Sequence, residues 1–352
     1  MAPVPPTSSK LFAVIGAGIA GIACARTLVQ AGHRVTVFEK SRGAGGRMAT
    51  RDTAFGTFDH GAQYFTVRDD RLRQVLALHP KQCKAWSANA VRVLDAQGRL
   101  VEAARPGSEP HWVAVPGMNA LVCQWAEPLA AAGQIELNTC VTAIQPDALD
   151  GRRWQLQTLA PDDASHVFGG FDGVLLALPA PQALALLQGG KLVPKFTKQV
   201  SKVQTAPCWT LMLAFPNAQQ PGLTTLGPQW NAARSTHHRI AWLARESSKP
   251  GRSSTERWTV QASADWSAEH LEDAPARAQA KLLKAFSEVT GIRATPAHTE
   301  VHRWRYARTT APLGRSHLWD AKAGIGVCGD WCIGHRVEDA FVSGLDLALA
   351  AA

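Results

Sequence analysis

Glycines near the N-terminus follow the spacing of a loop that binds phosphate groups. Residues 16–21 read Gly-Ala-Gly-Ile-Ala-Gly, the G-x-G-x-x-G pattern. The first glycine permits a tight turn, the second lets a pyrophosphate approach the backbone, and the third lets a helix lie close to a strand. An acid, Glu39, follows 18 residues after the last glycine, where it can accept hydrogen bonds from a ribose. The residues assigned to dinucleotide binding are Gly16, Ala17, Gly18, Ile19, Ala20, Gly21 and Glu39.

The surrounding elements are those that such a loop needs. Residues 11–15 are an apolar run that predicts a buried strand, and a helix follows to about residue 30, where Gly32 can end it. Residues 35–38 predict a second strand that stops at Glu39. Strand, turn, helix, strand and acid come in the order of a dinucleotide-binding unit, which a purely structural glycine turn would not require. A signal or membrane segment is excluded because the apolar stretch is short and contains Arg26.

A second glycine-rich loop follows directly, with the sequence KSRGAGGRM over residues 40–48. A flexible connection is the alternative, but its place after a nucleotide-binding unit predicts a second phosphate clamp. The guanidinium of Arg47, behind paired glycines, could reach a pyrophosphate with its planar fork. The residues assigned to this clamp are Lys40, Arg42, Gly46, Arg47 and Met48.

A third segment, FDHGAQYF over residues 58–65, combines small residues, an amide and aromatic rings. Small residues permit close approach, an amide can hydrogen-bond a heterocycle, and aromatic rings can wall a pocket. The alternative is an edge strand that packs its aromatic side chains into the core.

Together, GAGIAG, the acid at position 39, GAGGRM and DHGAQYF resemble the FAD-dependent amine-oxidase superfamily, and within it the bacterial renalase-like oxidoreductases. The resemblance implies that residues 61–64 run along the flavin ring and that a backbone group near residue 141 meets the adenine. Residues 329–330 resemble the C-terminal FAD signature, and the last helix would point its positive end at the flavin. The contacts that the resemblance implies are Gly61, Ala62, Gln63, Tyr64, Val141, Gly329, Asp330, Val337 and Glu338. No cysteine or histidine matches a covalent attachment point, so we expect FAD to bind non-covalently.

Composition places the chain among globular proteins of the cytoplasm. Its 352 residues suit two domains, and 46% of them are apolar. The net charge of +9 comes from scattered basic residues, which argues for a solvated surface or anionic small molecules rather than nucleic acid or a membrane. Seven dispersed cysteines favour a reducing compartment over a disulfide framework.

The predicted fold class is α/β plus α+β. A Rossmann-type FAD-binding domain, with a doubly wound and mostly parallel sheet, would comprise residues 10–70, 106–199 and 320–352. A substrate domain on a largely antiparallel sheet would comprise residues 71–105 and 200–319, where tryptophans occur in alternating runs. Residues 1–9 would be a disordered tail.

Tryptophans in a sheet are usually core residues, but a sheet that covers a flavin also needs flat apolar walls. The candidates for a substrate pocket are Trp242, Gln261, Trp304 and Tyr306. Gln261 stands where many relatives carry a histidine, so a histidine-based role is not expected. A basic cluster beside two serines, at residues 245–252, could meet an anionic substrate, with a solvated loop as the alternative.

The resemblance implies hydride transfer from a small substrate to flavin N5, with reoxidation by dioxygen to hydrogen peroxide. Renalase-like relatives oxidise misreduced dihydro isomers of NAD(P) to NAD(P)+, and a basic protein suits such an anionic dinucleotide. No catalytic side chain is assigned, because a dihydropyridine loses a hydride without a general base and positioning over N5 is the main demand. An amine or polyamine oxidase and a redox-silent FAD-binding protein are the alternatives. The sequence predicts no oligomeric state.

Overall fold

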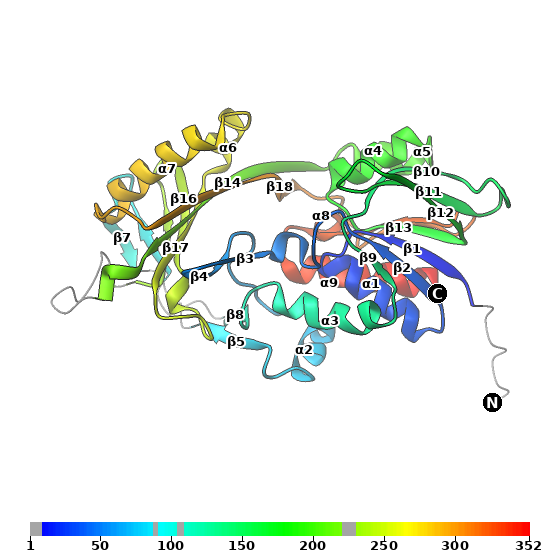
Figure 1. Ribbon diagram of the computed structural model, residues 1–352, viewed down its shortest axis with the longest axis horizontal. Coiled ribbons are helices and arrows are strands. Elements are labelled where there is room, and N and C mark those ends of the chain that lie inside the picture. The colour runs from blue at the N-terminus through cyan, green and yellow to red at the C-terminus, as the bar shows by residue number, and fades with distance from the viewer. Residues whose placement is uncertain (1–8, 87–90, 104–108, 220–229) are drawn as a thin grey trace. The chain divides into compact units, whose positions relative to one another are not determined.

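The computed structural model describes residues 9–86, 91–103, 109–219 and 230–352, which form two compact units (Figure 1). Unit 1 takes its described residues from Met1–Gly46, Val122–Gln204 and Thr310–Ala352, and unit 2 from Arg47–Leu121 and Thr205–Thr309. Residues 47–70 and 109–121, which lie in segments that we assigned to the cofactor domain, are compact with unit 2. The division into cofactor and substrate domains is a division by function, and it stays a prediction.

Unit 1 is built on a six-stranded sheet in the order β19-β20-β13-β1-β2-β9. All its neighbouring pairs are parallel except β19 and β20, which confirms the predicted doubly wound, mostly parallel sheet. The strands are β1 (Leu11–Ile15), β2 (Arg34–Phe38), β9 (Ile135–Glu136), β13 (Gly173–Leu176), β19 (Leu318–Asp320) and β20 (Ile325–Val327). The central strands are apolar throughout because helices cover both faces of the sheet.

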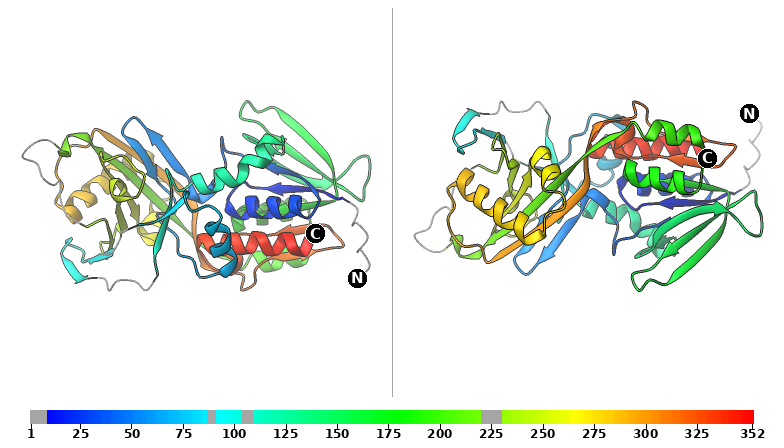
Figure 2. Two further views of the ribbon diagram at one scale, coloured as in Figure 1. Left: turned by 90° about the horizontal axis from the view of Figure 1, so that it is seen from below. Right: turned by 90° about the horizontal axis from the view of Figure 1, so that it is seen from above.

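Helix α1 (Ile19–Gln30) lies beside α9 (Val337–Ala351) on one face of this sheet (Figures 1 and 2). Gly32 adopts φ +89° just beyond α1, as predicted for a residue that ends a helix. The spacing of Phe341, Leu345 and Leu349 predicts an apolar face for α9, and this prediction is wrong at Leu349, which is 62% exposed. The buried residues of α9 include Phe341 and Leu347 but also the small Ser343 and Gly344, and Gly344 lets α1 pack closely against α9.

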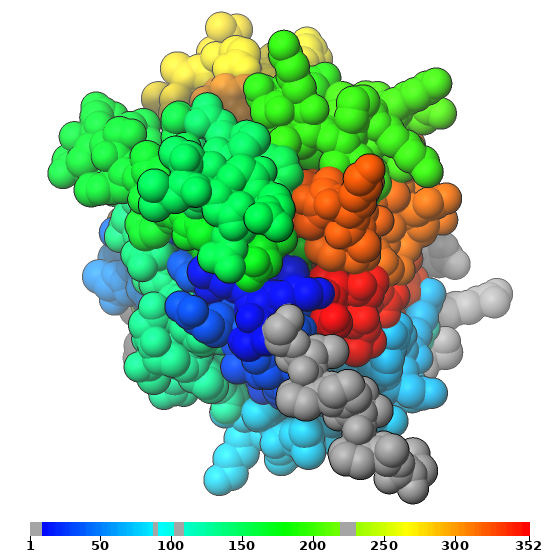
Figure 3. All heavy atoms as spheres, turned by 90° about the vertical axis from the view of Figure 1, so that its right-hand side faces the viewer, coloured from blue at the N-terminus to red at the C-terminus, as the bar shows by residue number. Residues whose placement is uncertain are grey.

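The opposite face of the sheet packs against α4 (Ala180–Gly189) and α5 (Pro194–Val200), which contribute Leu187 and Phe196 to the core. A three-stranded antiparallel sheet joins β10 (Cys140–Pro146), β11 (Trp154–Leu159) and β12 (Ser165–Phe171). The short α8 (Asp330–Ile333) follows β20, and α3 (Ala120–Ala131) begins at the boundary between the units. The two ends of the described chain adjoin, with Lys10 Nζ 3.4 Å from the Ala351 carbonyl oxygen (Figure 3).

Unit 2 is built on a seven-stranded sheet in the order β18-β14-β17-β16-β15-β6-β7. From β14 to β15 the neighbours are antiparallel, β6 joins β15 in parallel, and β7 is antiparallel to β6. The largely antiparallel second sheet is thereby confirmed. Its strands are β6 (Val91–Leu94), β7 (Leu100–Ala103), β14 (Gln204–Phe215), β15 (Ala232–Ser235), β16 (Ile240–Arg245), β17 (Glu256–Ala262) and β18 (His298–Ala311).

Shorter elements complete unit 2. They are the hairpin of β3 (Thr50–Thr53) and β4 (Gly56–Asp59), the ribbon of β5 (Cys83–Trp86) and β8 (His111–Ala114), the helices α2 (Asp70–Ala77), α6 (Ala264–Glu269) and α7 (Pro275–Thr290), and the 3₁₀ turns η1 (Gly46–Met48), η2 (Pro216–Gln219) and η3 (Glu246–Ser248). Leu282 and Phe286 of α7 pack with Trp258 of β17 in the core, so several tryptophans do have the structural role. The sequence predicts that Asp273 caps α7, since it stands just before Pro275 in the first turn, but the N-cap is Ala274 and the Asp273 carboxylate binds Lys281 at 3.1 Å.

Membrane-spanning helices are absent from the part of the chain that the structure describes, since none is both long and apolar enough.

Candidate functional site

The predicted cofactor residues of unit 1 gather at one edge of the parallel sheet. Gly16, Glu39 and Gly329 come just after the carboxyl ends of β1, β2 and β20, which run parallel in the same sheet. This edge is where doubly wound sheets bind their ligands. The structure therefore brings together three motifs that are far apart in the sequence.

The three glycines of the first motif are required for different reasons. Gly16 adopts φ +107°, and a side chain there would meet the Ala177 carbonyl oxygen at 2.6 Å. A Cβ on Gly21 would lie 1.9 Å from the Gly16 oxygen. Gly18 differs, because it has an ordinary φ of −74° and a Cβ would find only the Gly46 Cα at 4.0 Å. Protein packing does not explain this glycine, whereas close approach of a ligand to the backbone does.

The glycine-rich loop before residue 47 lies against the start of α1. The Gly45 N–H donates to the Ala17 carbonyl oxygen at 3.0 Å, and Gly45 forms a β-bridge with Gly18. Gly46 adopts φ +56°, and a Cβ there would stand 3.1 Å from the Gly18 Cα. The two predicted phosphate motifs are thus adjacent, with the exposed Lys40 and Arg42 at the start of the loop.

Glu39 is 8% exposed and orders this edge of unit 1. Its carboxylate accepts from the Ala17 N–H at 2.9 Å and from the Ser41 N–H at 2.8 Å. Its carbonyl oxygen accepts from the Thr139 N–H at 2.9 Å, which brings the chain just before Val141 alongside. A carboxylate has about four acceptor sites, so two remain for hydroxyl groups of a ribose.

The C-terminal motif depends on a serine that the sequence did not single out. Gly329 has φ +154°, and its N–H donates at 2.9 Å to Oγ of the fully buried Ser343 in α9. Asp339, in the first turn of the same helix, accepts from the N–H groups of residues 335 and 336 at 2.9 Å. No local sequence pattern identifies Ser343, because its role comes only from its position on α9, where it meets Gly329.

These features fit the adenosine diphosphate part of FAD. Gly18 leaves the backbone open, and the first turn of α1 has no acidic residue that would repel a phosphate. A glycine N-cap provides no side-chain acceptor for the first N–H groups of the helix, so they are available to an anion.

The predicted flavin segment of unit 2, residues 61–64, is held by backbone and amide hydrogen bonds. A Cβ on Gly61 would lie 2.1 Å from the Arg47 carbonyl oxygen, which accepts from the Ala62 N–H at 2.8 Å. The Gly61 carbonyl oxygen accepts from Gln261 Nε2 at 2.7 Å and from Gln63 Nε2 at 3.2 Å.

Three of the four predicted pocket residues lie against this segment. Besides Gln261, the Trp304 indole N–H donates to the His60 carbonyl oxygen at 2.9 Å. The ring of Trp242 has its centroid 5.7 Å from that of Tyr64. Tyr306 lies two residues beyond Trp304 on β18 and therefore on the same side of that strand.

Two histidines that are not among the predicted site residues lie beside Trp304. His60 and His302 approach it with ring centroids 5.2 and 4.3 Å away, and each other at 4.7 Å. Burial is the main cause that lowers the pKa of each ring to about 4. Repulsion by a protonated His302 also lowers the pKa of His60, and the charge of Arg51 lowers the pKa of both. Both rings are therefore neutral at pH 7.

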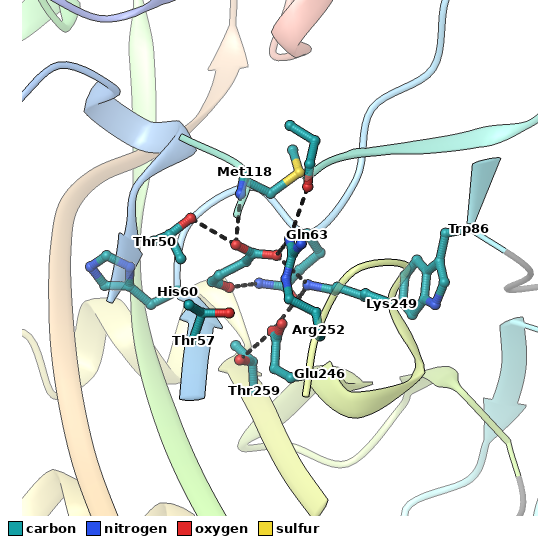
Figure 4. A network of polar contacts seen from close by, with 12 residues as sticks. Thr50, Thr57, His60, Gln63, Trp86, Met118, Glu246, Lys249, Arg252 and Thr259 are labelled. Carbon is teal, nitrogen blue, oxygen red and sulfur yellow. Dashed lines mark hydrogen bonds and ion pairs between the residues drawn. The ribbon is translucent and has the colours of Figure 1, made fainter. Parts of the chain in front are cut away.

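The Asp59 network, which comprises Asp59, Glu246, Lys249 and Arg252, is a group of side chains with no exposed surface (Figure 4). Asp59 Oδ2 accepts from Lys249 Nζ at 3.1 Å and from Arg252 Nη2 at 2.8 Å. Asp59 Oδ1 accepts from Thr50 Oγ1 and the Met118 N–H, both at 2.8 Å. Lys249 also donates to Glu246 Oε1 at 3.0 Å.

The two carboxyl groups of this network have opposite pKa shifts. Burial alone would raise the pKa of Asp59, but the charges of Lys249 and Arg252 and the bond from Met118 lower it to about 2. Burial raises the pKa of Glu246, and the charge of Asp59 adds to this while Lys249 opposes it. Among the described residues, Glu246 Oε2 has no hydrogen-bond partner.

The expectation of a solvated loop at residues 245–252, or of a site there for an anionic substrate, is wrong for Lys249 and Arg252. Both are bound to buried carboxylates, and Arg245 forms an ion pair with Glu256 at 3.5 Å. The i,i+3 spacing of Glu246 and Lys249 was the sequence signal for this pairing.

All seven cysteines are free thiols, of which four are buried and Cys208 is half-buried. Burial raises the pKa of Cys24 and Cys83 to about 12 and that of Cys208 to about 11. Burial also raises the pKa of Cys328 and Cys332 well above the usual value. Cys123 and Cys140 are exposed.

Comparison with known families now identifies the class of protein. Residues 14–77 match an NAD(P)-binding Rossmann-like domain, and residues 94–351 match the family described as flavin containing amine oxidoreductase. The second match covers more than half of the chain, so the protein belongs to this family. The cofactor that the family implies is FAD, which the residues at the sheet edge of unit 1 fit.

Individual proteins resemble the chain in two ways. The 4,4'-diapophytoene desaturases (4,4'-diaponeurosporene-forming) of Staphylococcus haemolyticus and Staphylococcus aureus are 46% and 49% identical to the chain over 58 residues. That match spans 16% of this chain and 12% of each relative. The crystal structure of a candidate protoporphyrinogen oxidase from Exiguobacterium sp. 255-15 has a TM-score of 0.73 and 15% identity, covering 98% of this chain and 99% of that one. This second likeness is one of fold alone.

Proposed function

We propose that the protein is a renalase-like FAD-dependent oxidase that removes a hydride from a misreduced dihydro isomer of NAD(P) and yields NAD(P)+. Dioxygen is the proposed electron acceptor and hydrogen peroxide the second product. The activity rests on the residues of unit 2 as well as on the nucleotide motifs, so each is considered in turn.

The supporting observation is that the four predicted pocket residues are uncharged and that the two histidines beside Trp304 are only weak bases. The four are tryptophan, glutamine and tyrosine side chains, and the nearby His60 and His302 have pKa values of about 4. An amine substrate must reach its neutral form before oxidation, whereas a dihydropyridine already carries the nitrogen lone pair that drives hydride loss. A wall of flat rings and an amide can position such a substrate without moving a proton.

FAD, when bound, supplies the electron acceptor at N5. The residues of unit 1 would hold it: the open backbone at Gly18 and the start of α1 would bind its phosphates, and Glu39 its ribose. We propose non-covalent binding, because none of the predicted contacts is a cysteine or histidine. Acid precipitation should then leave the yellow chromophore in the supernatant, and a yellow pellet would contradict this.

The test is anaerobic mixing of the FAD-loaded protein with three kinds of reductant. Borohydride-treated NAD, which contains the misreduced isomers, should bleach the flavin faster than ordinary NADH or a panel of amines. Bleaching by amines instead would make the protein an amine oxidase, and bleaching by none would make it a redox-silent binding protein. Protein that cannot take up FAD would end the proposal.

A variant at Gly18 separates cofactor loss from misfolding. Gly18→Ala adds a methyl group that the protein itself can accommodate, since the nearest atom is 4.0 Å away. We expect the melting temperature of the apoprotein to be unchanged while the affinity for FAD falls. Unchanged affinity for FAD would show that the backbone here does not meet the phosphates.

A further inference from the structure

The side-chain amide of Gln63 connects the predicted flavin segment to the Asp59 network (Figure 4). Gln63 is 5% exposed, and its Oε1 accepts from Lys249 Nζ at 3.3 Å. Its Nε2 donates to the carbonyl oxygens of Asp59 and of Gly61. A cationic side chain is thereby in contact with the segment through a single residue.

Lys249 determines which way this amide faces. An ammonium group has three donors and no acceptor, and the three acceptors of Lys249 are Asp59, Glu246 and Gln63. The amide oxygen must therefore face Lys249, which turns the NH₂ group toward the two carbonyl oxygens. A flipped amide would set donors against the ammonium and its oxygen against both carbonyls.

The amide in turn helps to fix the peptide between Gly61 and Ala62. The Gly61 carbonyl oxygen receives N–H donors from Gln63 and Gln261, and the Ala62 N–H donates to the Arg47 carbonyl oxygen. Both sides of this peptide are thus held by groups outside it. Gly61 has no side chain through which its orientation could be set instead.

The network is a costly way to obtain stability alone. Removing four charged side chains from water carries a desolvation penalty, and apolar residues of similar volume often serve stability as well or better. A buried charge does, however, impose one hydrogen-bond arrangement on its neighbours, because an ammonium accepts no alternative. The arrangement imposed here ends at the segment predicted to face the flavin.

We propose that Lys249 is a positioning residue for the cofactor: through the amide of Gln63 it sets the orientation of the Gly61–Ala62 peptide along the flavin ring. The proposal rests on the proposed function, because it takes residues 61–64 as flavin contacts. Lys249 itself is not assigned a contact with substrate or flavin.

The experiment compares Lys249→Met, Gln63→Met and the double variant, with Lys195→Met as a control. Lys195 is exposed on α5, so its replacement removes the same charge without touching the network. The readouts are FAD affinity by fluorescence quenching, the absorption spectrum of bound FAD, and deuterium exchange of peptides covering residues 58–66 in the apoprotein. Melting temperatures are recorded alongside.

We expect each single variant to weaken FAD binding about 10-fold, equivalent to about 1.4 kcal/mol, and to shift the flavin spectrum. The double variant should bind no more weakly than the weaker single variant, since both break one chain of contacts. Exchange over residues 58–66 should accelerate in both single variants, and Lys195→Met should behave as the wild type. Gln63→Met leaves all four charges in place, so it provides the test even if Lys249→Met does not fold.

Variants that lose only melting temperature, with wild-type FAD affinity, spectrum and exchange, would overturn the proposal and leave the network a structural role. Additive losses in the double variant would also overturn it. Failure of the wild type to bind FAD is a different result, because it ends the proposed function. In that case accelerated exchange would still support control of the peptide by Lys249, and unchanged exchange would exclude it.

Discussion

Asp59 accepts four hydrogen bonds with its carboxylate, and its side chain has no exposed surface. The stability of unit 2 therefore depends on this buried charge. Glu246 lies in the same network but binds through one oxygen only, to Lys249 and Thr259. The two acids therefore differ in how much the fold depends on their charge. This difference can be measured, because each has an amide isostere.

Asp59→Asn should lower the free energy of unfolding by about 3–5 kcal/mol, since it leaves Lys249 and Arg252 buried beside a neutral group. Glu246→Gln should cost less than about 1.5 kcal/mol, because burial and the charge of Asp59 already oppose ionisation there and the Oε1 acceptor is kept. Urea unfolding at pH 7 measures both. Equal losses of unfolding free energy in the two variants would contradict the expectation that the fold depends more on the charge of Asp59 than on that of Glu246.

At the scale of elements, the contact between α1 and α9 is made possible by Gly344. A Cβ at this position would lie 2.0 Å from the Ala20 carbonyl oxygen, in the first turn of α1. That turn also belongs to the predicted phosphate-binding motif of residues 16–21, so a change in the helix contact should also change this motif. Gly189, at the end of α4, is a suitable comparison, since a Cβ there meets nothing within 4 Å.

Gly344→Ala should therefore lower the free energy of unfolding by about 1–3 kcal/mol through overpacking and also weaken FAD binding. Gly189→Ala should be neutral or stabilise by up to about 1 kcal/mol, because alanine is favoured over glycine in helices. Chemical denaturation and FAD titration of both variants provide the measurement. A Gly344→Ala protein with wild-type stability would show that the helices can separate at no cost.

The elements that the sequence predicted well are those with a local cause. Strand β1, the G-x-G-x-x-G turn and the end of α1 near Gly32 follow from adjacent residues, and all three were confirmed. The close packing of α9 on α1 was missed at Leu349 and Gly344, because hydrophobic spacing does not show where two backbones will touch. Ser343 was missed because its partner, Gly329, lies outside its own helix, and Glu246 was missed although its i,i+3 spacing to Lys249 could have indicated the pairing.

For the whole molecule, the chain passes between the two units four times, so neither is a continuous segment. Sequence composition could predict two kinds of sheet, but it could not place residues 47–70 with the second of them. That placement depends on the buried contacts of Asp59 with Lys249 and Arg252, almost 200 positions further along the chain.

Stability of the whole protein should fall as the pH is lowered from about 6.5 to 4. His60 and His302 have folded pKa values of about 4, whereas unfolded histidines take up protons near pH 6.5. The unfolded state then binds more protons, so the free energy of unfolding decreases with falling pH. Urea unfolding across this range should show a shallower decline for His302→Gln than for the wild type.

The control for this prediction is His166→Gln, at an exposed position of β12. A decline as steep in His302→Gln as in the wild type would mean that His302 takes up its proton at the same pH in the folded and unfolded states. Below about pH 4 a separate loss should begin, because an unfolded aspartate takes up its proton near pH 3.9, whereas Asp59 in the folded protein has a pKa of about 2.

The buried thiols determine how well the protein would resist oxidation by the hydrogen peroxide that the proposed reaction releases. Peroxide attacks the thiolate form of cysteine, and a thiol with a pKa of about 12 is ionised in roughly one molecule in 10⁵ at pH 7. The interior sulfurs of both units are thus kept in their unreactive form by the packing around them. Oxidative damage over many turnovers should begin at the exposed Cys140, because burial raises the pKa of Cys123 as well, and should leave the sheet edge and the aromatic wall intact.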